Sequence, residues 1–336
     1  MNETDKVFVA DHQGMVGAAI RRQLIEHGHP AANIVTLSAG HGPLQDQATV
    51  QDFLARERPD QIYLPVWATH GSTGAQHPAT ALLSLCHVIH AASVQQINKL
   101  VLVGTPHVYP QAAMSPMAEE DLLTGRLDPA TETSGLAQIA AIKLCEALSR
   151  TPHGASGGLD YRCLVTPTPY GPGDAYPTAA GHTVAGIMYR LHQAKVNGNM
   201  HVNLPAQDAG WHEYLHVDDV ARAAMYLMNV SQSAYRQQVR NGIGHLNAGN
   251  GKDCSVNALA HTIAGIVSYT GALTVSAPRT SNSVDIDVDT QPRHRLDSHR
   301  MRSLGWRPAL DIEDGLALTY FSYLSQHTRS LKPSVI

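Results

Sequence analysis

The fold is decided by the first segment of the chain, Val7-Phe8-Val9-Ala10-Asp11-His12-Gln13-Gly14-Met15-Val16-Gly17. Its first four residues form a short apolar run, which predicts a buried strand. Residues Gly14 to Glu26 then carry apolar side chains at helical spacing. A strand, a turn with glycine and a helix in this order indicate the first unit of a parallel α/β sheet.

This unit repeats along the first half of the chain. Apolar runs are each followed by helical spacing, as Ile34–Leu37 with Gln47–Arg56, Gln61–Leu64 with Ala79–Ala92, and Leu100–Val103 with Ser134–Ser149. Repeated units with right-handed crossovers predict an α/β fold with a Rossmann-like, doubly wound parallel sheet.

The pattern changes after the strand expected at Tyr161–Val165, where loops rich in Pro and Gly begin. Such interruptions are typical of a smaller lobe that covers the carboxyl ends of the strands. We therefore expect residues 1–165 to form a nucleotide-binding domain to which residues 211–250 return. Residues 166–210 and 251–330 are expected to form the smaller, C-terminal substrate-binding lobe.

The composition narrows the class of protein. Of 336 residues, 43% are hydrophobic and 15% are charged, and the formal net charge is −4, which suits a globular domain. No run of Lys or Arg is long enough to predict a nucleic-acid or membrane partner, so we expect a small-molecule substrate. The polar start, Met1 to Lys6, predicts a cytoplasmic protein. Four cysteines lie far apart without CxxC pairing and are expected to be structural.

The first turn contains the candidate cofactor-binding residues, Asp11, Gly14, Met15, Val16 and Gly17. Glycines in such a turn let the backbone approach a dinucleotide pyrophosphate, which lies at the helix N-terminus. Here Asp11 replaces the first glycine and brings a carboxylate near the phosphate. The end of the second strand has neither an acid for a ribose hydroxyl nor a basic residue for a 2′-phosphate. We expect NADPH and NADH to bind weakly, with dissociation constants above ~100 μM.

Seven blocks of sequence resemble the GDP-L-fucose synthases, which are extended short-chain dehydrogenases of the NAD-dependent epimerase/dehydratase family. They occur in the family's order and spacing over nearly the whole chain. The blocks are Asp11–Gly17, Gly104–Pro110, Ile142–Glu146, Tyr170–Pro172, Leu215–Asp219, Asn247–Gly251 and Leu304–Trp306. The resemblance implies 3,5-epimerisation of GDP-4-keto-6-deoxymannose, followed by reduction with NADPH, in a homodimer joined by helices.

The resemblance also implies roles for single residues. The family's catalytic hydroxyl matches Thr105, and its Tyr-x-x-x-Lys pair matches Ser134 and Gln138. A serine hydroxyl is a much weaker proton donor than a phenol of pKa ~10, and a neutral glutamine supplies no charge. We therefore expect the reductive chemistry of the family to be lost, so that NADP(H), the cofactor that the resemblance implies, is in doubt.

The resemblance also assigns positions to the family's proton-transfer and substrate-binding residues. The family's Cys and His acid/base pair corresponds to His107 and His182, and an imidazole can exchange protons near neutral pH. The three arginines that contact the substrate diphosphate correspond to Arg190, His212 and Arg293. Anion recognition is thus expected to be kept in part.

Three interpretations stay open. In the first, the chain is an enzyme that uses the acid/base pair on a nucleotide-sugar-like or other keto substrate, as an isomerase, lyase or cyclase without net redox change. In the second, it is a non-catalytic binding or regulatory paralogue. In the third, it is an NADPH-dependent epimerase/reductase of GDP-4-keto-6-deoxymannose. A metal site is not expected, because the histidines that face the predicted cleft lack the spacing of zinc ligands.

Overall fold

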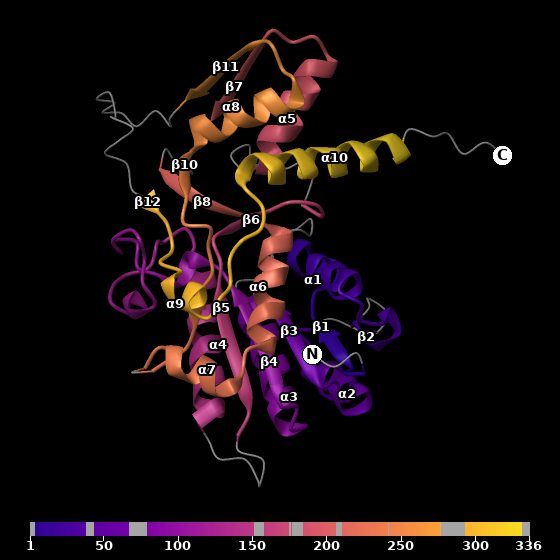
Figure 1. Cartoon of the computed structure of the whole chain (residues 1–336), viewed down its shortest axis with the longest axis vertical. Helices are drawn as coiled ribbons and strands as arrows, with labels where there is room; N and C mark the ends of the chain where they lie inside the picture. The colour runs from indigo at the N-terminus through magenta and orange to yellow at the C-terminus, as the bar shows by residue number, and fades with distance from the viewer. Residues whose placement is uncertain are drawn as a thin grey trace, which may run out of the picture.

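The structure is a computed structural model. It describes residues 4–37, 44–66, 79–150, 158–174, 176, 184–205, 210–240, 242–276 and 293–330. Figure 1 shows a large lower part built around one sheet and a smaller upper part, with the helix α10 lying across the junction.

The lower part contains a parallel sheet of six strands in the order β2-β1-β3-β4-β5-β9. The strands are β1 (Val7–Val9), β2 (Ile34–Val35), β3 (Gln61–Pro65), β4 (Lys99–Gly104), β5 (Asp160–Val165) and β9 (Leu246–Asn247). Strand progression reverses between β1 and β3, and ligands of open α/β sheets bind at such a switch point. The predicted doubly wound parallel sheet is confirmed.

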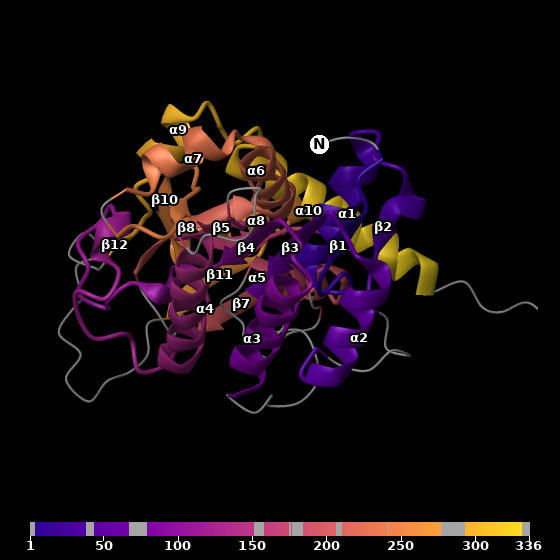
Figure 2. The same ribbon diagram turned by 90° about the horizontal axis from the view of Figure 1, so that it is seen from below.

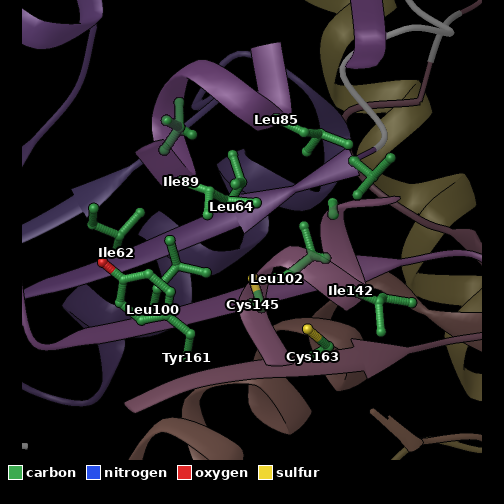
Figure 3. Close-up of a cluster of buried hydrophobic side chains, with 14 of the residues drawn as sticks. Ile62, Leu64, Leu85, Ile89, Leu100, Leu102, Ile142, Cys145, Tyr161 and Cys163 are labelled. Carbon is green, nitrogen blue, oxygen red and sulfur yellow. The ribbon is translucent and has the colours of Figure 1, made fainter. Parts of the chain in front are cut away.

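Helices cover both faces of this sheet, as Figure 2 shows from below. One face carries α2 (Gln47–Glu57), α3 (Ala79–Val94) and α4 (Glu132–Arg150), and the other carries α1 (Met15–Glu26) and α6 (Val217–Asn229). Successive strand residues point to opposite faces. Leu100 and Leu102 therefore lie in the cluster under α3 and α4, whereas Val101 and Val103 lie in the cluster under α1 and α6. Figure 3 shows the first cluster.

The smaller part packs around a third apolar cluster. Its strands are β6 (Thr168–Tyr170), β7 (His201–Pro205), β8 (Trp211–His216), β10 (Asp253–Ser255), β11 (Ala272–Ser276) and β12 (Arg293–His294), and its long helices are α5 (Val184–Val196), α8 (Val256–Val267) and α10 (Ile312–Ser330). The remaining helices are short: α7 (Gln232–Gln238), α9 (His299–Ser303), and the 3-10 turns η1 (Ala31–Asn33), η4 (Pro106–Val108) and η5 (Glu119–Asp121). The domain boundary expected at residue 165 stays a prediction.

Among the helices in the described ranges of the chain, none is both long enough and apolar enough to cross a bilayer.

Candidate functional site

The end of β4 positions the first candidate residues. Thr105 follows the strand directly and caps η4, because its hydroxyl oxygen accepts a hydrogen bond from the backbone N–H of His107 at 3.3 Å. Pro106 at the start of η4 favours this tight turn, since its φ is already fixed at a helical value. The strand and the turn together place Thr105 and His107 at the carboxyl edge of the sheet, where α/β enzymes bind their ligands.

Gln138 on α4 joins this turn through a buried hydrogen-bond network. Its amide oxygen accepts from the backbone N–H of Thr105 at 2.7 Å, and its amide nitrogen donates to Thr105 Oγ1 at 2.9 Å and to Ser134 Oγ at 3.0 Å. Gln138 is fully buried and Thr105 almost so. Because a buried amide can satisfy donors and acceptors together, Gln138 fills this position without the cost of a buried charge.

The network determines what the two hydroxyl groups can do. An hydroxyl that accepts from Gln138 Nε2 keeps its own proton for another partner. The Ser134 hydroxyl can therefore donate to a carbonyl oxygen. The Thr105 hydroxyl lies 3.1 Å from Gln138 Oε1 and donates there, so it joins Ser134 only when a bound carbonyl replaces that acceptor. Two donors of this kind polarise a carbonyl and stabilise negative charge on its oxygen. Neither hydroxyl is a strong proton donor, so the arrangement suits enolate stabilisation better than proton delivery.

His107 lies half-buried beside this network, under the first turn of α4. A Cβ added at Gly135 of α4 would lie 2.3 Å from the carbonyl oxygen of His107, so the helix and the turn are in direct contact. The structure thus brings His107, Thr105, Ser134 and Gln138 together. His182, its expected acid/base partner, lies outside the described residues, and the pairing stays a prediction.

The turn between β1 and α1, where a nucleotide is expected to bind, contains a largely buried carboxylate, Asp11. Asp11 has a φ of 50°, a left-handed conformation that Asp tolerates better than most residues. Its carboxylate bends over Gly14, where an added Cβ would lie 1.9 Å from Asp11 Oδ2. Burial raises the pKa of Asp11 to about 6. Gly14 caps α1 without any side-chain hydrogen bond.

This turn can be tested against the dinucleotide that the fold implies. The glycines at positions 14 and 17 allow a close backbone approach, because an added Cβ at Gly17 would lie 2.1 Å from Asp11 O. However, the Asp11 carboxylate lies over Gly14, the N-cap of α1, at the helix N-terminus where a pyrophosphate would bind. Two negative charges about 4 Å apart repel by ~4 kcal/mol at an effective dielectric constant of 20. The turn therefore does not fit NADP(H) while Asp11 is ionised.

The expected substrate-binding residues lie in the smaller part. The His212 ring on β8 stacks on the His294 ring on β12, with ring centroids 5.4 Å apart and an interplanar angle of 16°. Arg293 pairs with Trp211 in the register of the same two strands, and its side chain lies outside what the structure describes. Arg190 is half-buried on α5. The fold thus places Arg293 on the strand beside His212, one register position away, and a diphosphate role for these residues stays a prediction.

Sequence reasoning assigned no role to a second buried network, directly below η4. The Tyr109 hydroxyl lies between His245 Nε2 at 2.7 Å and Asn247 Oδ1 at 2.6 Å. Glu119 accepts from the backbone N–H of Asn247 at 3.0 Å. Burial lowers the pKa of His245 to about 3 and raises that of Glu119 to about 7. Tyr109 and Asn247 were part of the resembling blocks, which was the available signal for them.

Within the described ranges, no three His, Cys, Asp or Glu side chains lie close enough together to hold a metal ion.

Comparisons with known proteins identify the family of the chain. Residues 7–241 match the NAD dependent epimerase/dehydratase family. The chain is 35% identical to GDP-L-fucose synthase of Escherichia coli strain K12, over 96% of this chain and 98% of that protein. It is 34% identical to GDP-L-fucose synthase 1 of Arabidopsis thaliana, over 96% and 94%. A solved structure of GDP-mannoheptose C4 reductase from Campylobacter jejuni with NADP bound is 25% identical, with a TM-score of 0.79 over 96% of this chain and 99% of that one.

Proposed function

Because the chain belongs to the NAD dependent epimerase/dehydratase family, we propose that it acts on a GDP-linked keto sugar, the kind of substrate that the GDP-L-fucose synthases use. The reaction is epimerisation next to the ketone, by proton transfer. Similarity along nearly the full length of several GDP-L-fucose synthases supports the substrate class.

The observation that carries the reaction is the Ser134–Gln138–Thr105 network. It leaves the Ser134 hydroxyl able to donate to a carbonyl oxygen, and the Thr105 hydroxyl can join it by turning from Gln138 Oε1 to the substrate. Such donation acidifies the C–H groups next to the carbonyl. His107 lies beside these donors and can serve as the base, with His182 as the proposed acid on the other face of the sugar. An epimerase of this kind needs no hydride donor, which agrees with the carboxylate in the nucleotide turn.

A complete, NADPH-dependent epimerase/reductase is the second candidate function. It is favoured by the relatives themselves, which are GDP-L-fucose synthases over nearly their whole length, and by the similar reductase with NADP bound. In this reading the Asp11 side chain moves away from Gly14, and a hydroxyl takes over the role of the family's phenol. Because such a hydroxyl is a weak acid, this candidate predicts slow reduction.

One experiment distinguishes the candidates. The protein is incubated with GDP-4-keto-6-deoxymannose in D2O, with and without NADPH, and both deuterium at C3 and C5 and NADPH oxidation are measured. Deuterium incorporation without NADPH oxidation supports the epimerase. Stoichiometric NADPH oxidation supports the second candidate, and neither signal, despite binding of the sugar nucleotide, indicates a non-catalytic paralogue.

The control variant is Thr105→Val, which keeps the shape of the side chain and removes its hydroxyl. Loss of one donor to a developing oxyanion costs about 10²- to 10³-fold in rate. The exchange rate of Thr105→Val should fall by this factor if the protein catalyses it. An unchanged rate would identify the exchange as uncatalysed enolisation.

Two further expectations accompany this function. We propose a homodimer, the assembly that the resemblance implies, which light scattering of the purified protein tests. We also propose a cytoplasmic location, which fractionation of the source cells tests.

A further inference from the structure

Tyr109 is the centre of the buried network below η4. It follows η4 directly, and its backbone N–H closes the turn by donating to Pro106 O at 3.0 Å. Its side chain is only 4% exposed, and its hydroxyl contacts two residues at β9, His245 and Asn247. One residue thus connects the turn that carries His107 to the last strand of the sheet.

The hydrogen bonds of this network have a fixed direction. The Tyr109 hydroxyl donates to Asn247 Oδ1, so it must accept from His245 Nε2. His245 is neutral, because burial lowers its pKa to about 3, and its one ring proton is therefore assigned to Nε2. The orientation of the Asn247 amide is fixed as well, since its nitrogen donates to Met117 O at 3.1 Å.

Glu119 and Arg300 extend the network beyond Asn247. Glu119 Oε1 accepts from the Asn247 backbone N–H, and Glu119 Oε2 lies 3.2 Å from Arg300 Nε. Met117 accepts from Asp297 N at 2.8 Å, in the segment that continues β12. The network therefore joins the catalytic turn to the chain segment that carries His294.

We propose that Tyr109 is a positioning residue for catalysis. By holding the turn against β9, it fixes the hydroxyl of Thr105 and the imidazole of His107 relative to the substrate carbonyl. The turn is then clamped between Tyr109 below and Gly135 of α4 above, whose Cα approaches the His107 carbonyl closely. The proposal rests on the function proposed above, and it adds a residue that does not itself touch the substrate.

The test compares Tyr109→Phe with Tyr161→Phe. Tyr161 is an equally buried tyrosine whose hydroxyl donates to Ile97 O at 3.1 Å, at the amino end of β5. In the deuterium incorporation assay, Tyr109→Phe should lower kcat on the order of tenfold to hundredfold, because a small misplacement of reacting groups has effects of this size. KM should stay within about twofold, because the groups that bind the substrate are unchanged. Tyr161→Phe should change neither.

A second measurement keeps the proposal testable if the wild type shows no exchange chemistry. Hydrogen–deuterium exchange of the backbone amides of Thr105, His107 and Val108 should become faster in Tyr109→Phe and stay unchanged in Tyr161→Phe, at temperatures well below both melting points. No substrate is needed, so failure of the proposed function and failure of the clamp give different results. The proposal is overturned if these amides exchange as in the wild type, or if kcat and KM change equally in both variants.

Discussion

The residues that follow β4 and those that follow β1 differ in how the protein accommodates buried polar groups. At the end of β4, Ser134 and Gln138 are neutral at positions where the resemblance implies a phenol and an ammonium group, and Gln138 hydrogen-bonds to Thr105 and Ser134. At the end of β1, a glycine is replaced by Asp11, whose burial raises its pKa to about 6. The first group of residues is neutral by residue type, whereas Asp11 becomes neutral only below about pH 6. The two sites should therefore respond differently to pH and to substitution.

Restoring the family's residues should produce the largest effect. The double variant Ser134→Tyr with Gln138→Lys is expected to remain a poor reductase, because Asp11 still opposes the dinucleotide. Adding Asp11→Gly should raise NADPH oxidation with GDP-4-keto-6-deoxymannose by about 10²- to 10³-fold, because it removes a repulsion of ~4 kcal/mol between the carboxylate and the pyrophosphate. Steady-state kinetics of the two variants measures this. Rapid oxidation by the double variant alone would contradict our interpretation of the turn.

Breaking the neutral network should cost stability as well as activity. Gln138→Leu leaves the backbone N–H of Thr105 and two hydroxyl groups without their buried partner, which lowers the free energy of unfolding by about 2–4 kcal/mol. Ser134→Ala removes a single bond from a half-buried hydroxyl and should cost about 1 kcal/mol. Urea denaturation followed by circular dichroism compares the two. Equal losses of unfolding free energy in the two variants would mean that the hydrogen bonds of Gln138 do not act together.

Gly135 tests the contact between α4 and the catalytic turn. Gly135→Ala introduces a methyl group 2.3 Å from the His107 carbonyl, so the turn must shift, at a cost of about 1–3 kcal/mol. The control is Gly265→Ala in α8, where an added Cβ meets no atom within 4 Å. That change should stabilise the protein by about 0.5–1 kcal/mol, because alanine favours a helix interior. Thermal melting shows whether each variant is more or less stable than the wild type. A Gly135→Ala protein as stable as the wild type would refute the close contact.

Asp11 should produce the smallest effect, and one that depends on pH. The folded state holds the Asp11 proton more tightly than the unfolded state, since burial raises the pKa from 3.8 to about 6. The wild type therefore loses stability as the pH rises through this window, and Asp11→Asn does not. The variant should be the more stable protein at pH 7, with the difference disappearing below about pH 4. Burial also raises the pKa values of Glu119 and Glu213, so these groups make the stability of both proteins depend on pH. Their effects cancel when the unfolding free energy of the wild type is subtracted from that of Asp11→Asn at each pH.

The same variant tests the cofactor. Asp11→Asn should bind NADPH at least tenfold more tightly than the wild type at pH 7, because it removes the repulsion without removing the side chain. Fluorescence titration measures this, and low-micromolar binding by the wild type would show that Asp11 does not oppose the dinucleotide.

The sequence by itself determined the sheet and the family. Apolar runs of strand length alternate with helical spacing, and this periodicity specifies a parallel sheet whatever the details of packing. It also identified Thr105, Ser134 and Gln138 as residues of one site, because blocks of sequence around them keep the family's spacing. Side-chain type alone then predicted the weak acidity of the site.

Only the tertiary structure decided how these residues interact. The orientation of the Gln138 amide depends on the backbone N–H that Thr105 presents after β4, which lies 33 residues away in the sequence. The network of Tyr109 joins segments separated by more than 100 residues, and its members are ordinary polar residues when read along the chain. Their burial, which fixes the direction of each hydrogen bond and shifts each pKa, arises only when β4, β9 and the returning segment pack together.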